Sequence, residues 1–206
     1  MSIYNDYILP PILNLAMQAP GLGDYRQRLL GQAHGRVLEI GIGSGLNLPY
    51  YGAAVTEIIG LDPSPRLLEM TRQRSARAGR PVTLLAQPAR AIALEDGSID
   101  TVVSTWTLCS ITPLAPALAE ICRVLRPQGQ FLFVEHGLAP DKGVQRWQHR
   151  LTPAWSQLAG GCHLNRPIDR LVREAGFRIE RLDTGYMSRA PRLLSHMYLG
   201  RAVPEP

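Results

Sequence analysis

From about residue 36 onward, short runs of apolar residues alternate with longer stretches in which apolar positions recur at helical spacing. The apolar runs lie at residues 37–40, 56–61, 82–85, 101–104 and 131–134. Short runs that are largely apolar are typical of strands buried on both faces of a parallel sheet. Because helical stretches and short loops separate the strands, the pattern predicts a doubly wound α/β domain.

Helices are predicted between these strands. Ser64 followed by Pro65 is typical of a helix start, and the spacing predicts a helix that continues to about residue 78. Apolar positions from Leu114 to Leu125 recur along one face of a second predicted helix, which is expected to stop at Pro127. Both helices would cover the sheet and bury its apolar side chains.

The two ends of the chain depart from simple alternation. Residues 1–35 are predicted to form an N-terminal helical segment, and residues 36–206 form the main domain. Within that domain, residues 141–165 keep helical spacing but are interrupted at Pro153, and we expect this insertion to act as a substrate lid. The remaining elements are a helix at 168–175 and two final strands at 177–182 and 197–202.

Composition and charge narrow the possible partners. The chain has 206 residues, of which 45% are hydrophobic and 19% charged, enough for one domain with a real core. The net charge is +5, and of its 22 basic residues only Lys142 is a lysine. The arginines are spread along the chain, which favours a solvated surface over a nucleic-acid site; an anionic membrane surface remains an alternative. Mechanisms that need several lysines are excluded.

Cysteine usage and the N-terminal sequence indicate the compartment. Cys109, Cys122 and Cys162 are odd in number and lack metal-type spacing, so we expect a reducing, cytoplasmic environment and no metal site. The N-terminus has no basic region or cleavage site typical of a secretory signal. The apolar run at 7–17 is too short to span a bilayer. Packing on the domain is the favoured interpretation of this run, with peripheral membrane contact as the alternative.

The strongest chemical signal is a strand that runs into the glycine turn 41–45 (Gly-x-Gly-x-Gly). Glycines allow positive φ and close approach of a ligand to the backbone. A dinucleotide fingerprint would place its third glycine at Leu46, which disfavours a nicotinamide enzyme. Asp62 follows the second strand, where a carboxylate can accept hydrogen bonds from both ribose hydroxyls of an adenosine. Together with Glu39, the turn therefore predicts an adenosine cofactor; the alternative is glycines that serve only strand-to-helix packing.

Motifs at 39–45, 60–64, 96–100 and 124–129 resemble those of class I S-adenosylmethionine-dependent methyltransferases, over about residues 36–136. The resemblance implies a Rossmann-like seven-stranded sheet with an antiparallel last strand, and S-adenosyl-L-methionine as cofactor with S-adenosyl-L-homocysteine as product. It places Glu39 toward the methionine end and Asp62 at the ribose. The implied cofactor-binding residues are Glu39, Gly41, Gly43, Ser44, Gly45, Asn47, Asp62, Pro63, Ala89 and Thr105. The loop at 87–90 has no acid, so backbone groups and apolar walls are expected to recognise adenine.

A narrower resemblance covers about residues 36–200. Its motifs are Leu108-Cys-Ser-Ile111, Glu135-His136, Trp147-Gln148, Pro153-x-Trp155 and Gly161-Cys-x-Leu-x-Arg166. These motifs are similar to the methyltransferase-like family, whose mammalian members are alkyl-thiol S-methyltransferases of the endoplasmic reticulum membrane and which has bacterial relatives. The present sequence shows no long apolar anchor of the mammalian type, so we expect a bacterial-type member.

Two residues are candidates for catalysis. His136 follows the fifth strand at the carboxyl edge of the sheet, and we expect it to act as a base or to bind the acceptor; the alternative is a histidine that ties down a loop. Arg166 would favour a thiolate or bind an acidic group on the substrate, and the alternative is a surface arginine at a helix start. The expected substrate-binding residues, with plain core packing as their alternative, are Trp106, Leu108, Cys109, Trp147, Trp155 and Cys162.

The leading hypothesis is a soluble methyltransferase that acts on a small, fairly apolar acceptor, most favourably a thiol. N- or O-methylation of a lipid head group or a quinol-like molecule is a second hypothesis, and a cofactor-binding module without catalysis is a third. Nucleic acid is disfavoured as a partner, because Thr105-Trp-Thr-Leu108 stands where an acidic-or-Asn-Pro-Pro-aromatic motif would be expected. Monomer and homodimer both remain open.

Overall fold

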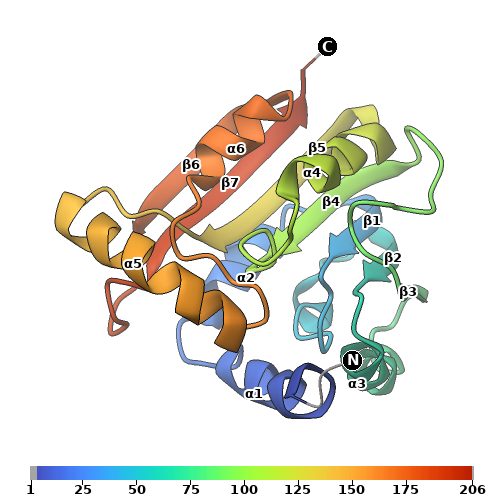
Figure 1. Cartoon of the computed structure of the whole chain (residues 1–206). Coiled ribbons are helices and arrows are strands. Elements are labelled where there is room, and N and C mark those ends of the chain that lie inside the picture. Colours follow the sequence, from blue (N-terminus) through green and yellow to red (C-terminus); the bar gives the residue numbers. More distant parts are fainter. Residues whose placement is uncertain (1–3, 206) are drawn as a thin grey trace.

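The computed structural model describes residues 4–205, and within them seven strands form one mixed sheet (Figure 1). The strands are β1 (Gly35–Ile40), β2 (Val55–Leu61), β3 (Val82–Leu85), β4 (Ile99–Thr105), β5 (Leu125–His136), β6 (Phe177–Tyr186) and β7 (His196–Pro204). Their spatial order is β3-β2-β1-β4-β5-β7-β6. β1 to β5 pair in parallel, whereas β7 is antiparallel to both β5 and β6. The predicted doubly wound sheet with an antiparallel last strand is confirmed.

Helices cover both faces of this sheet. They are η1 (Tyr4–Ile8), α1 (Leu9–Ala16), α2 (Leu22–Leu30), η2 (Leu48–Tyr50), α3 (Pro65–Ser75), α4 (Leu114–Val124), α5 (Lys142–Leu158) and α6 (Ile168–Glu174). α4 and α6 pack on one face, where Phe131 and Phe133 of β5 point, and α2 and α3 pack on the other, with Leu132 and Val134. This alternation along β5 follows from the two-residue repeat of a strand.

Several predicted boundaries differ from the structure; the last two strands, for example, extend beyond their predicted ranges. α3 begins after Ser64, whose hydroxyl caps the backbone N–H of Leu67, but the helix ends at Ser75 instead of residue 78. Leu125, predicted on a helical face, begins β5. The helix ends before Arg126, which directly precedes Pro127 and is therefore biased toward an extended backbone. α5 continues through Pro153, a residue that lies on the exposed side of the helix.

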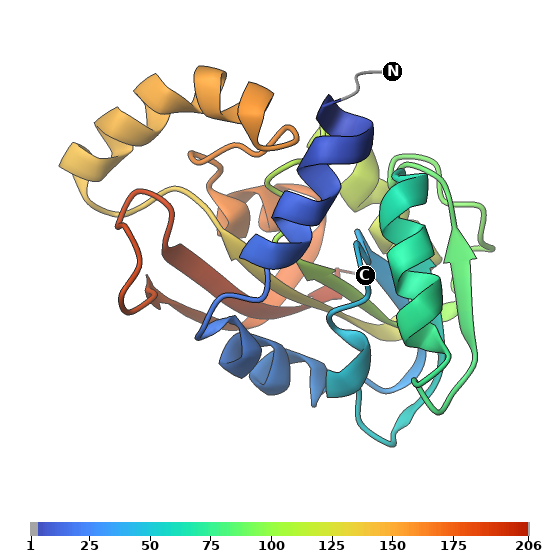
Figure 2. The ribbon, with the colours of Figure 1, turned by 90° about the horizontal axis from the view of Figure 1, so that it is seen from below.

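The carboxyl ends of the parallel strands lie together along one edge of the sheet. Parallel strands present their carboxyl ends along the same edge, and the loops that follow β1, β2, β4 and β5 meet there. Figure 2 shows α1 lying across this edge between α5 and α3. No helix within residues 4–205 combines the length and the hydropathy needed to cross a bilayer.

Candidate functional site

A cavity of about 720 Å³ opens at this edge of the sheet. Its floor is built from the ends of β1, β2, β4 and β5 and the loops that follow them, and its roof includes residues of α1 and of α5. The cavity falls in the size range of ligand sites that enclose most of a small molecule. The chemistry of the cavity therefore depends on which groups the strand ends carry.

The glycine turn has the backbone geometry that the sequence predicts. Gly41, Gly43 and Gly45 have φ of +67°, +58° and +78°. A Cβ added to Gly41 would lie 2.4 Å from the Thr107 side chain, so only glycine permits this close approach between the turn and the loop after β4. Gly41 and Gly43 line the cavity, whereas Gly45 faces Thr71. The turn thus exposes bare backbone at the cavity wall.

Asp62 anchors one end of the cavity. Its two carboxylate oxygens accept hydrogen bonds from the backbone N–H groups of Gly43 (3.0 Å) and Ser64 (2.8 Å). Burial raises the pKa of Asp62 to about 6, although these two hydrogen bonds oppose the shift. Each oxygen retains a lone pair that can accept a further hydrogen bond. Asp62 is therefore oriented to bind a pair of hydroxyl groups.

Glu39 is the second buried acid of the cavity. One carboxylate oxygen accepts a hydrogen bond from Asn47 Nδ2 (2.8 Å) and the other accepts one from the Tyr51 hydroxyl (2.7 Å). Burial raises the pKa of Glu39 to about 7, against the opposing effect of these hydrogen bonds and of the Arg26 charge. Asn47 also donates to Thr105 Oγ1 at 2.9 Å, so β1 and β4 are joined at this point.

These groups fit S-adenosylmethionine. The carboxylate of Asp62 can accept hydrogen bonds from ribose hydroxyls, and the carboxylate of Glu39 can accept them from an ammonium group. Apolar wall residues, including Ile40, Ile42 and Leu61, supply surface for an aromatic base. Of the cofactor-binding residues predicted from the sequence, all but Gly45 line the cavity. Their contacts with the cofactor stay predictions.

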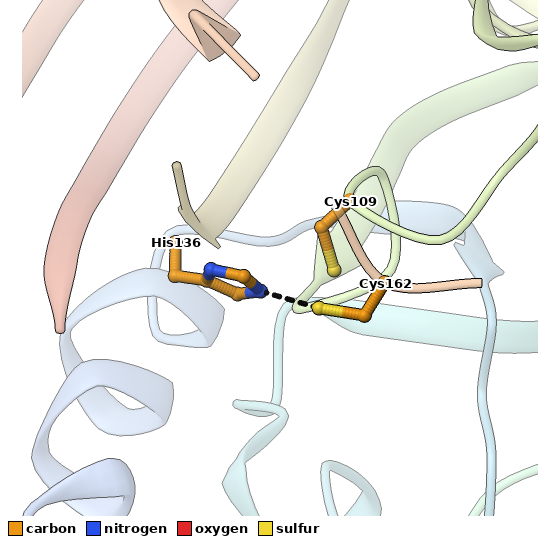
Figure 3. A group of neighbouring side chains, drawn as sticks. All are labelled: Cys109, His136 and Cys162. Carbon is orange, nitrogen blue, oxygen red and sulfur yellow. Dashed lines mark hydrogen bonds between the residues drawn. The ribbon is translucent and has the colours of Figure 1, made fainter. Parts of the chain in front are cut away.

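The opposite end of the cavity holds the Cys–His–Cys cluster, formed by Cys109, His136 and Cys162 (Figure 3). His136 Nε2 lies 3.1 Å from Cys162 Sγ, and Trp155 Nε1 donates to the same sulfur at 3.3 Å. Burial opposes protonation of His136, but the interactions with Cys162 and Glu135 raise its pKa overall. The hydrogen bond with Cys109, together with burial, raises the pKa of the Cys162 thiol.

Glu135 supports this end of the cavity from beneath. Its Oε1 accepts hydrogen bonds from the Ser104 hydroxyl (2.8 Å) and from the backbone N–H groups of Thr107 (3.0 Å) and Leu108 (3.1 Å). Burial raises the pKa of Glu135, while these donors lower it. The loop that carries Cys109 is thereby fixed to the end of β5. The sequence indicated Glu135 only as a neighbour of His136.

Arg166 is placed beside the cavity-lining loop. Its guanidinium donates to the carbonyl of Leu108 and to Thr112 Oγ1, the latter at 3.1 Å. These contacts hold the loop 108–112 in place. The predicted role of Arg166 toward a thiolate stays a prediction.

Some of the predicted substrate-binding residues line the cavity and others do not. Trp106, Cys109, Trp155 and Cys162 line the cavity. Leu108 is fully buried in the core, and Trp147 is 56% exposed on α5, beside a separate shallow depression. Two wall components were not predicted. Arg26 of α2 stands over the Trp106 ring at 5.0 Å, and α1 contributes wall residues, among them Leu13 and Asn14.

Known proteins resemble this chain in sequence. A family model described as "Methyltransferase domain" matches residues 38–133. The human thiol S-methyltransferase TMT1A is 37% identical over 149 residues, which cover 68% of this chain and 59% of that protein. The human thiol S-methyltransferase TMT1B is 34% identical over 181 residues, which cover 82% of this chain and 72% of that protein. Proteins named as lipid and quinone methyltransferases are also similar to parts of the chain.

A solved structure agrees in fold. The S-adenosylmethionine-dependent methyltransferase from Aquifex aeolicus superposes with a TM-score of 0.67 at 16% identity, covering 95% of this chain and 98% of that chain. At this identity the agreement concerns the fold alone.

The seven-stranded sheet with its antiparallel last strand is the fold of the class I S-adenosylmethionine-dependent methyltransferases. The chain belongs to this family, as its match to TMT1B shows. The region matched in TMT1A spans 59% of that protein, less than two thirds of its length. The resemblance drawn from the sequence motifs is confirmed.

Proposed function

We propose that the protein transfers a methyl group from S-adenosylmethionine to a small, fairly apolar thiol. The observation that carries this proposal is the continuity of one cavity, which joins the glycine turn and Asp62 to the Cys–His–Cys cluster. Trp106, Ile111 and Trp155 line the same cavity and supply apolar surface for a short alkyl chain. The names of the TMT1 relatives support a thiol as the acceptor.

When bound, S-adenosylmethionine supplies a methyl group on a positively charged sulfur, so the donor is already activated. The protein then has to align the acceptor and exclude water. Asp62 would hold the ribose hydroxyls and Glu39 the methionine ammonium group, with the backbone of the turn 41–45 between them. The apolar wall at Trp106 and Trp155 would orient the alkyl part of the acceptor.

His136 would assist deprotonation of the acceptor. A free thiol has a pKa of about 8.5, so only a few per cent is thiolate at neutral pH. His136 Nε2 already lies within hydrogen-bond distance of a sulfur, Cys162 Sγ. An acceptor S–H placed at this end of the cavity would lose its proton to Nε2 as its sulfur forms the new bond to carbon. The donor sulfur keeps the electron pair of the bond that breaks.

The test is an acceptor screen with the purified chain and isotopically labelled S-adenosylmethionine. We expect multiple turnovers on short alkyl thiols or sulfide and none on matched alcohols of the same chain length. Turnover on amines, phenols or lipids with none on any thiol would contradict the proposal. Binding of the cofactor without turnover on any acceptor would favour the third hypothesis, a binding module without catalysis.

A second candidate function is methylation of a lipid head group or a quinol-like acceptor at a membrane surface. η1, α1 and α5 expose several large apolar side chains, namely Tyr7, Ile8, Ile12, Leu15, Trp147, Leu151 and Leu158. Lys142, Arg146 and Arg150 are exposed on α5 and add positive charge. Apolar residues beside basic ones favour contact with anionic lipid surfaces.

Vesicle flotation separates this candidate from the first. If the acceptor lies in a membrane, the chain should float with anionic phospholipid vesicles and Leu15→Asp should reduce the bound fraction. Turnover on dispersed phosphatidylethanolamine or a quinol, exceeding turnover on thiols, would establish the second candidate. Absence of flotation together with thiol turnover would favour the first candidate function, methylation of a small thiol.

A further inference from the structure

The Cys–His–Cys cluster brings together three side chains from three distant segments (Figure 3). Cys109 lies in the loop after β4, His136 ends β5, and Cys162 follows α5. One ligand atom from each of them lies within 4.8 Å of the other two. All three residues line the cavity, so the space next to these atoms is open on one side.

This arrangement is close to that of a tetrahedral metal site. Zinc binds cysteine sulfur at about 2.3 Å and histidine nitrogen at about 2.0–2.1 Å, which sets neighbouring ligand atoms roughly 3.5–3.8 Å apart. His136 Nε2 and Cys162 Sγ lie 3.1 Å apart, and the full set lies within 4.8 Å. Small rotations of the side chains would bring the three atoms to coordination distance.

We propose that Cys109, His136 and Cys162 bind one thiophilic divalent metal ion of the zinc class, with its fourth position facing the cavity. Two sulfurs and an imidazole exclude magnesium and calcium, which require oxygen ligands. Three protein ligands with one open position are typical of catalytic zinc sites, whereas structural sites use four. The inference departs from the expectation of no metal site, because the ligands are 26 or more residues apart in sequence.

The surroundings of the cluster suit two thiolates and a divalent cation. The charges of the metal ion and its two thiolate ligands sum to zero, so burying this group without an acceptor adds no net charge. The Trp155 indole N–H donates to Cys162 Sγ at 3.3 Å, and N–H donors to a ligating sulfur orient it and stabilise its anionic form. The guanidinium of Arg166 is held beside Leu108, the neighbour of Cys109, and adds positive charge.

The metal site deepens the proposed function: thiol methylation stays, but the role of His136 changes from base to metal ligand. The catalytic part of this inference rests on the proposed function. An acceptor thiol that occupies the fourth position would bind as thiolate, because coordination deprotonates a thiol. The protons of Cys109, Cys162 and the acceptor leave to solvent, and His136 coordinates through Nε2 instead of accepting a proton. Methyl transfer leaves a neutral thioether, a weaker ligand than a thiolate, which favours release of the product.

The primary test measures metal binding without any assay of activity. The full chain is reduced, stripped with a chelator and titrated with Co²⁺, whose absorption reports sulfur coordination, and then with competing Zn²⁺. We expect one equivalent of Co²⁺ with sulfur-to-metal charge-transfer bands. Cys162→Ser should weaken binding by about tenfold or more, since it removes one of three ligands. Cys122→Ser, at the cysteine on α4, is the matched control and should bind as the unaltered chain does.

A second measurement keeps the proposal testable if a variant does not fold. In the unaltered chain, bound Zn²⁺ should protect Cys109 and Cys162, but not Cys122, from alkylation by iodoacetamide, as read by peptide mass spectrometry.

Three outcomes would overturn the metal site. They are no stoichiometric binding, equal protection of all three cysteines, and binding that persists unchanged in Cys109→Ser and Cys162→Ser. If the chain free of metal methylates thiols, the catalytic role of the metal is contradicted but the proposed function stands. If the chain binds the metal but methylates no thiol, the metal site stands but the proposed function is contradicted.

Discussion

Asn47 connects Arg26 to Glu39 through a chain of two hydrogen bonds. Arg26 Nε donates to Asn47 Oδ1 at 2.9 Å, and Asn47 Nδ2 donates to Glu39 Oε1 at 2.8 Å. Arg26 also donates to the carbonyl of Met17 at 2.9 Å. The segment that follows α1 is thereby tied, through α2, to the buried carboxylate of Glu39. The Asn47 amide therefore couples the N-terminal segment to the Glu39 carboxylate.

Asn47→Ala should destabilise the fold. The substitution leaves Arg26 and Glu39 partly unsatisfied in buried positions, which costs about 1–3 kcal/mol of unfolding free energy. Urea denaturation measures the change. Asn165→Ala, which removes an amide bonded to His149 near the surface, is the matched control, and we expect it to stay within about 0.5 kcal/mol of the unaltered chain. Equal effects of the two substitutions would contradict the buried network.

Asp62→Asn should weaken binding of S-adenosylmethionine by about tenfold or more, because a carboxylate accepts hydrogen bonds to hydroxyl groups more strongly than an amide does. Titration calorimetry measures the affinity. Asp96→Asn is the control, since the Asp96 side chain is 78% exposed and pairs with Arg123 away from the cavity. Unchanged affinity in Asp62→Asn would overturn the assignment of this residue to the ribose.

The burial of Glu39 predicts a dependence of stability on pH. Burial raises the pKa of Glu39 from 4.5 to about 7, so the stability that this group contributes is complete below about pH 4.5 and is lost as the pH rises through about 7. A shift of this size corresponds to about 3 kcal/mol. Glu39→Gln cannot ionise, so its unfolding free energy relative to the unaltered chain should increase by that order between these pH values. Urea denaturation across the range tests this.

The control for Glu39→Gln is Glu69→Gln, at an exposed position of α3 that pairs with Arg72. A difference between Glu39→Gln and the unaltered chain that does not change with pH would show that Glu39 is ionised throughout, and that its burial is less complete in solution.

The position of the turn 41–45 and Asp62 at one end of the cavity could be predicted from the sequence, because it depends on neighbouring strands. The turn 41–45 and Asp62 follow consecutive strands, and adjacent parallel strands bring their carboxyl ends together whatever the rest of the chain does. The roof of the cavity could be predicted only in part. The run at 7–17 was expected to pack on the domain, but helical spacing does not say which surface it covers. That depends on contacts such as Ser44 Oγ to Asn14 Oδ1, at 2.8 Å.

The acceptor end could not be predicted to the same degree, because it is assembled by tertiary packing. Cys109 and Cys162 meet only when the segment after α5 folds back, where the His163 backbone N–H donates to the Cys109 carbonyl at 2.9 Å. Helical spacing also assigned Trp147 to the same wall as Trp155, whereas only Trp155 lines the cavity. A curve or a small rotation of a helix changes which face points inward, and the sequence pattern does not record it.

His136→Ala should separate the acceptor end of the cavity from the cofactor end. Removing the imidazole, whether it serves as base or as ligand, should lower kcat for thiol methylation by roughly 100-fold or more. The affinity for S-adenosylmethionine should change little, because the assigned cofactor-binding groups, Glu39 and Asp62, are held by bonds that do not involve His136. Steady-state kinetics and calorimetry on the same preparation measure both quantities. His149→Ala, on the exposed face of α5, is the matched control. A loss of cofactor affinity equal to the loss of kcat would mean that His136 shapes the whole cavity and has no particular role toward the acceptor.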